Sequence, residues 1–201
     1  MPTIAGNVLA RGPKWAQVPF YSLDNVDPWW DSREALREEA LKVRPLMDHR
    51  FLLEVPNTGR ETSVTLDFQF VSEHTPVLNT FRENFFDRYG DLGSTHTHYF
   101  YIDENANYEW HRDNVLPTAT TEEGKNLPVN CCMNVIVTDD GSECEFAGAG
   151  TFKYTAGILN TSILHRIQPS EIRILARISF LDLVYEEVVH KIRKVNKQLY
   201  K

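Results

Sequence analysis

The sequence contains little cysteine, no long apolar run and no excess of positive charge. Its three cysteines show no Cys-x-x-Cys spacing, which argues against a disulfide framework and against a structural zinc site. No apolar stretch approaches the roughly 20 residues of a membrane helix, and the first residues lack the pattern of a secretory signal. A net charge of −7 argues against binding to nucleic acid or anionic membranes. We therefore expect a cytoplasmic protein with ordinary buried thiols.

The composition that is present favours one folded domain. Hydrophobic residues make up 42% of the 201 residues, which is enough for a substantial core. We expect a single domain over 1–201, with helical support over about 1–93, a β core over about 94–183 and a C-terminal helix over about 184–201. The basic end of that last helix is read as a solvated face.

Two helices are predicted before the β core. Asp31 or Ser32 can cap the first helix, which should end near Pro45. The second should follow Pro76 and stop at Gly90, because glycine readily adopts the conformation that ends a helix.

The pattern of residues changes in the β core. The stretch SVTLDFQFV (63–71) already alternates, and residues after 90 form short runs of β-branched and aromatic residues between turn clusters. The clearest runs are THTHYFYI (95–102), YEWHRD (108–113), PVNCCMNVIVT (128–138) and IRILARISF (172–180). Short strands at this close spacing predict a mainly β fold, an antiparallel sandwich or jelly roll, with helices at its flanks.

One short motif, NYEWHRDN (107–114), carries two candidate metal ligands. On an extended strand His111 and Asp113 would share a face, while Arg112 would point away. Such a pair alone is weak evidence for a metal site, because a His-x-Asp match arises easily by chance. His165, at the end of another predicted strand, supplies a third ligand. Two histidines and one carboxylate with open coordination positions form the facial triad that holds non-haem Fe(II).

An arginine follows the distal histidine. His165 lies 54 residues after His111, and Arg173 follows eight residues later on the next predicted strand. With this His-x-Asp, distal His and trailing Arg, residues 95–181 resemble the Fe(II)/2-oxoglutarate-dependent oxygenases, and YIDENANYEWHRD and HRIQPSEIR resemble their prolyl-hydroxylase-like branch. The resemblance implies a double-stranded β-helix, or jelly roll. It also implies that Fe(II), 2-oxoglutarate and O2 are used to hydroxylate a C–H bond, releasing succinate and CO2.

The resemblance also suggests which residues bind the cosubstrate. Arg173 would hold the far carboxylate of 2-oxoglutarate through two parallel hydrogen bonds. Arg177 faces the same side of the predicted strand and stays an alternative, although it lies about 13 Å further along. Tyr101 occupies the place of a tyrosine that lines the cosubstrate pocket in this branch. Asn134 stands where that branch often has another tyrosine, and its amide can still donate a hydrogen bond.

Several readings remain open at this stage. His96 and His98 could compete as ligands, but no carboxylate accompanies them, so we expect pocket-lining or, preferably, exposed strand residues. A cupin-like metal-binding jelly roll without 2-oxoglutarate is the main alternative, as a small-molecule dioxygenase, an isomerase or a non-catalytic binder. The substrate suggested by the prolyl-hydroxylase-like motifs is an amino acid or a peptide.

Overall fold

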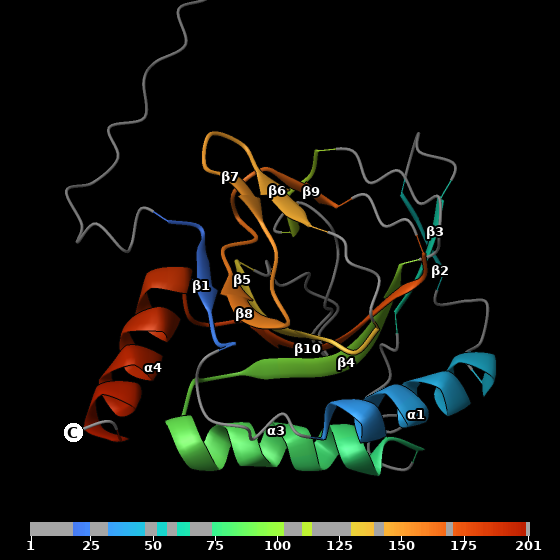
Figure 1. Cartoon of the computed structure of the whole chain (residues 1–201), viewed down its shortest axis with the longest axis horizontal. Coiled ribbons are helices and arrows are strands. Elements are labelled where there is room, and N and C mark those ends of the chain that lie inside the picture. Colours follow the sequence, from blue (N-terminus) through green and yellow to red (C-terminus); the bar gives the residue numbers. More distant parts are fainter. Residues whose placement is uncertain are drawn as a thin grey trace, which may run out of the picture.

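The structure is a computed structural model of the chain (Figure 1). It describes residues 18–24, 32–46, 52–55, 60–64, 74–102, 110–113, 130–138, 143–167 and 171–199. Its strands are β1 (Phe20–Ser22), β2 (Leu52–Val55), β3 (Arg60–Val64), β4 (Thr95–Ile102), β5 (Cys131–Ile136), β6 (Cys144–Phe146), β7 (Gly150–Phe152), β8 (Ala156–Leu159), β9 (His165–Ile167) and β10 (Arg173–Phe180). Its helices are α1 (Arg33–Val43), the 3-10 turn η2 (Arg44–Leu46), α3 (Pro76–Tyr89) and α4 (Tyr185–Leu199). This confirms a mainly β fold with flanking helices.

The strands of the described residues form two antiparallel sheets. The large sheet has seven strands in the order β1-β8-β5-β10-β4-β3-β2, and the small sheet has three in the order β7-β6-β9. The centre of the large sheet is the long pair β4 and β10, which are matched from Thr95 opposite Phe180 to Ile102 opposite Arg173. Strands β1, β2 and β3 also join this sheet, so the segment expected to give helical support contributes strands as well.

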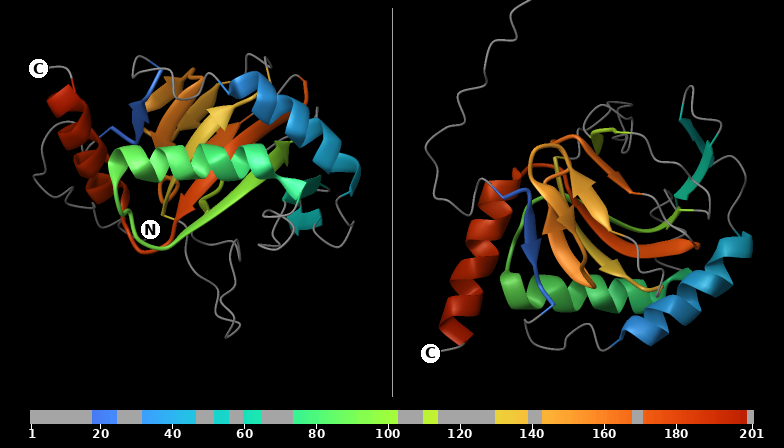
Figure 2. Two further views of the ribbon diagram at one scale, coloured as in Figure 1. Left: turned by 90° about the horizontal axis from the view of Figure 1, so that it is seen from below. Right: turned by 45° about the horizontal axis from the view of Figure 1, so that its top comes forward.

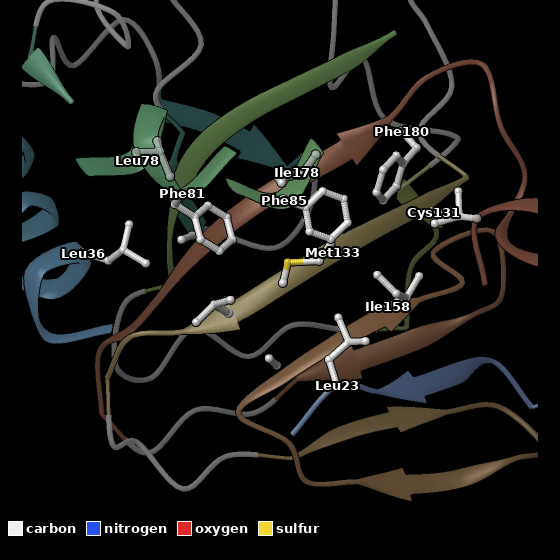
Figure 3. Packing of buried hydrophobic residues seen from close by; sticks show 14 of the residues in the cluster. Leu23, Leu36, Leu78, Phe81, Phe85, Cys131, Met133, Ile158, Ile178 and Phe180 are labelled. Atoms are coloured by element: carbon white, nitrogen blue, oxygen red, sulfur yellow. The ribbon is translucent and has the colours of Figure 1, made fainter. Parts of the chain in front are cut away.

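Helices α1, α3 and α4 all cover one face of the large sheet, which we call the helix face (Figures 1 and 2). Side chains alternate along a strand, so every second residue of β10 points to this face. Figure 3 shows Phe81 and Phe85 of α3 beside Ile178 and Phe180 of β10, within a large apolar cluster. The rings of Phe85 and Phe180 lie 6.2 Å apart. Most of the apolar core is therefore on the helix face.

A buried carboxylate joins the two long N-terminal helices. Glu39 of α1 accepts hydrogen bonds from the backbone N–H groups of Val77 and Leu78, at 2.7 and 2.9 Å, and from the Tyr99 hydroxyl, at 2.7 Å. The first N–H groups of a helix have no partner inside it, and Thr75, the N-cap of α3, makes no side-chain cap. Glu39 thus caps α3 from a neighbouring helix.

The opposite face of the large sheet packs on the small sheet, and we call it the inner face. A second apolar cluster lies here and joins Leu175 of β10 to Cys144 and Phe146 of β6 and Ile167 of β9. In the part of the chain that the structure describes, no helix is long and apolar enough to cross a membrane.

Candidate metal centre

Backbone pairing brings the predicted metal ligands together. The N–H of His111 donates to the carbonyl of His165, and the N–H of His165 donates to the carbonyl of His111, both at 3.0 Å. The N–H of Asp113 donates to the carbonyl of Thr161, also at 3.0 Å. Within residues 110–113 this bridge replaces the strand that was expected. The two histidines are therefore placed directly opposite each other.

The three side chains have the spacing of a metal site. One ligand atom from each of His111, Asp113 and His165 lies within 4.8 Å of the other two, and no further such group occurs among the described residues. Oδ1 of Asp113 is 3.7 Å from Nε2 of His111 and 3.6 Å from Nε2 of His165. Two atoms that are each about 2.1 Å from one cation cannot be more than about 4.2 Å apart. Both distances fit a shared ion.

His165 has a tautomer suited to metal binding. Its Nδ1 donates to the carbonyl oxygen of Ile163 at 2.9 Å, so Nε2 keeps its lone pair for a cation. Burial lowers the pKa of His165, and this effect outweighs the opposing attraction of Asp113. The ring is thus neutral at physiological pH, which is the form that binds metals.

Asp113 is held as a carboxylate by its neighbours. Burial alone would raise its pKa, but Arg177, His165 and His111 outweigh this effect and lower the pKa below its usual value. Nη2 of Arg177 donates to Oδ2 of Asp113. One carboxylate oxygen therefore faces the two imidazoles and the other faces the guanidinium.

A second arginine lies further from the triad on the inner face. Arg173 begins β10, is fully buried, and donates from Nη2 to the Tyr154 hydroxyl at 3.3 Å. Nδ2 of Asn134 donates to the same oxygen at 3.4 Å. Burial raises the pKa of Tyr154 to about 12, against the opposing effect of Arg173. Arg173, Asn134 and a neutral phenol thus form one polar group.

The sheet register separates the two arginines. Arg177 lies opposite His98 on one neighbouring strand and Asn134 on the other. Between the two arginines, Leu175 lies opposite Phe100 and Ile136, so an apolar row crosses three strands. From the sequence, Arg177 was expected to lie further from the metal ligands than Arg173, and this order is wrong. Arg177 contacts Asp113, whereas Arg173 begins β10, about 13 Å from Arg177 along the strand.

Two sequence-based placements on β4 need correction. The Tyr101 hydroxyl donates to the carbonyl of Ala40 in α1 at 2.7 Å, and its ring belongs to the cluster on the helix face. The structure does not bring it to the triad, because alternation along β4 sends it to the opposite face. His98, which was expected to be exposed, is only 5% exposed. Its ring packs 4.9 Å from that of His96.

The cysteines are buried free thiols, as expected. Burial raises the pKa of Cys132 and of Cys144 to about 12, so both thiols are neutral. No cysteine takes part in the His-Asp-His group.

Tyr154 is the partner that sequence reasoning missed. It lies in the short link between β7 and β8, outside any motif, and only the fold brings it to Arg173.

Comparisons with known proteins give a likeness in fold. No family model and no curated protein matches the chain. The crystal structure of HygX from Streptomyces hygroscopicus with nickel and 2-oxoglutarate bound aligns with a TM-score of 0.50 and 14% identity, over 82% of this chain and 83% of that chain. A Pseudomonas putida prolyl-4-hydroxylase gives a TM-score of 0.48 and 13% identity, over 83% and 94%. The chain thus shares the fold of HygX.

Proposed function

We propose that this chain is an Fe(II)- and 2-oxoglutarate-dependent oxygenase whose two sheets form a double-stranded β-helix. The observation that carries this proposal is the convergence of His111, Asp113 and His165 within 4.8 Å. Two imidazoles and one carboxylate, with further coordination positions open, are the ligand set of non-haem Fe(II) oxygenases. The shared fold with HygX, whose crystal structure has 2-oxoglutarate bound, supports the same assignment.

We assign the cosubstrate clamp to Arg173. Arg177 already donates to Asp113, whereas Arg173 lies on the same face of β10 and further from the triad. A guanidinium can bind a carboxylate through two parallel hydrogen bonds. Asn134 and Tyr154 stand beside Arg173 and can orient the same group. Tyr101 has no part in this clamp.

The protein contributes binding, orientation and exclusion of water. When bound, iron and 2-oxoglutarate supply the oxidation of an unreactive C–H bond, with release of succinate and CO2. His111, Asp113 and His165 hold the cation, and Arg173 fixes the far end of the cosubstrate. The apolar row around Leu175 keeps water away from the span between them, which strengthens each charged contact.

The substrate that we propose is an amino acid or a peptide, through hydroxylation of one of its C–H bonds. This rests on the likeness of YIDENANYEWHRD and HRIQPSEIR to the prolyl-hydroxylase-like branch. The net charge of −7 favours such a substrate over nucleic acid.

An anaerobic titration tests the function directly. Adding Fe(II) and then 2-oxoglutarate should produce a visible metal-to-ligand charge-transfer band, because the 2-oxo acid chelates the metal. The same titration of Asp113→Ala is the matched control and should stay colourless. Cation binding without the band would favour the cupin-like alternative. Absence of cation binding would refute both readings.

A further inference from the structure

Arg177 is an unusual neighbour for a metal ligand, because it places a positive charge beside a cation site. Its guanidinium contacts Oδ2 of Asp113, while Oδ1 of the same carboxylate points to both imidazoles. Both partners are nearly buried, so water screens the contact little. The pKa of Arg177 is raised: burial would lower it, but Cys132 and Asp113 outweigh that effect. The guanidinium is therefore permanently charged.

This contact has a geometric consequence. A carboxylate can bind a metal through one oxygen or through both. Oδ2 of Asp113 accepts a hydrogen bond from Arg177 and Oδ1 faces both imidazoles, which favours binding of a cation through Oδ1 alone. Groups around metal ligands commonly orient them in this way.

The contact also has an electrostatic consequence. Asp113 brings one negative charge to the triad. Arg177 brings one positive charge that offsets it. Once a divalent cation binds, the centre carries two positive charges, which match a dianionic ligand.

We propose that Arg177 is a positioning residue that holds Asp113 as a one-oxygen ligand and offsets its charge, so that the metal-loaded centre prefers dianions. This inference rests on the proposed metal centre. It gives Arg177 a role different from that of Arg173, which lies at the far end of the apolar row.

Cobalt(II) absorption tests the positioning role without relying on activity. The unaltered protein is titrated first, and failure to bind Co(II) would refute the metal centre itself. In Arg177→Met, Asp113 should bind through both oxygens, which raises the coordination number and weakens the visible Co(II) bands. Arg177→Lys should restore much of the original spectrum. Arg173→Met, which removes another buried arginine from the same face, is the matched control and should leave the spectrum unchanged.

An oxalate titration of the Co(II)-loaded proteins tests the charge. Oxalate is a dianion too short to reach a distant clamp, so it reports on the metal centre alone. Its affinity should fall at least about tenfold in Arg177→Met and stay close to the original in Arg177→Lys. Arg173→Met should bind oxalate normally. If Arg177→Met keeps both the spectrum and the oxalate affinity of the unaltered protein, the inference is wrong.

Discussion

The two faces of β10 differ in chemistry although both are buried. All eight residues from Arg173 to Phe180 are buried. Toward the helices the strand presents Ile174, Ala176, Ile178 and Phe180, which pack in the large apolar cluster. Toward the small sheet it presents two arginines, a leucine and a serine. One strand therefore supplies both a core and a polar site.

This difference separates stability from function. Apolar burial stabilises the fold, whereas a buried charge loses its hydration and regains that energy only through good partners. On the inner face Arg177 donates a hydrogen bond to Asp113, and Arg173 donates one to Tyr154. Substitutions on the helix face should mainly lower stability, and those on the inner face should mainly change ligand binding.

The largest effect is expected at the metal ligands. His111→Ala, Asp113→Ala and His165→Ala should each weaken Fe(II) or Co(II) binding by roughly 100-fold or more, because each removes one of three ligands. The helix face is untouched, so far-UV circular dichroism should show an intact fold. Replacing Asp113 by alanine leaves the buried Arg177 charge without this partner. Asp113→Asn keeps a polar side chain beside Arg177 and is therefore a second test of the metal ligand. Retained affinity in His111→Ala would contradict the assignment.

The next effect tests the helix face. Phe85→Ala should lower the free energy of unfolding by about 3–5 kcal/mol, because it leaves a cavity against Phe180. Denaturant titration measures the change. Below the unfolding transition, Co(II) affinity should equal that of the unaltered protein. A weakened metal site in the folded variant would show that the faces are coupled.

Glu39 offers a polar test on the same face. Glu39→Gln should cost about 1.5–3 kcal/mol of stability, because charged hydrogen bonds to the first turn of α3 and to Tyr99 are weakened. Glu38→Gln is the matched control, since that side chain is exposed on the same helix. Equal unfolding midpoints for the two variants would refute the capping role.

Arg173 tests the inner face. Arg173→Met should weaken apparent 2-oxoglutarate affinity on the order of 30-fold, because a bidentate partner of a desolvated carboxylate is lost. Fe(II) binding should be nearly unchanged. Stability should not fall much, since apolar replacements of buried charges are often neutral or stabilising. A succinate-release assay with varied 2-oxoglutarate measures the affinity, and a normal value would remove Arg173 from the clamp.

Much of the fold could be predicted because its signals are local. Pro76 and Gly90 delimit α3 as expected, and the run of β-branched and aromatic residues at 95–102 is β4. Residues 108–113 could not be settled in this way, because the described part pairs through one bridge to His165 and not through a strand. The cap that Glu39 provides joins two helices distant in sequence, so no local pattern announces it.

In the candidate site too, some features could be predicted from the sequence and others only from the fold. Residue type and spacing were sufficient to select His111, Asp113 and His165, which the fold brings together. Parity left Arg173 and Arg177 equivalent, because four residues along a strand return to the same face. Distance along the strand was the remaining sequence argument, and it gave the wrong order, because the fold places Asp113 beside Arg177. The same parity rule, applied along β4, puts Tyr101 and His98 on opposite faces, and the structure shows that the face of Tyr101 is the helix face.

The smallest expected effect compares two adjacent cysteines. Cys131 and Cys132 are both fully buried on β5, yet Cys131 belongs to the helix-face cluster and Cys132 to the inner-face cluster. Neither should be needed for metal binding. A serine hydroxyl at position 132 would lie near Arg177 and Asn134, which can bind it. At position 131 it would lie in the helix-face cluster, where the thiol has no such hydrogen-bond partner among the described residues. The two positions therefore sample the two faces with the same chemical change.

Cys131→Ser should thus cost about 1–3 kcal/mol of unfolding free energy, the usual penalty for a buried hydroxyl without a partner. The loss of unfolding free energy in Cys132→Ser should be about 1 kcal/mol smaller than in Cys131→Ser. Denaturant midpoints of the two variants, measured side by side, give the difference, and Cys131→Ala and Cys132→Ala correct for lost sulfur packing. Equal costs for the two serines would mean that the inner face is no more tolerant of polar groups. A thiolate-to-cobalt absorption band that disappears in either variant would instead show that a cysteine binds the metal.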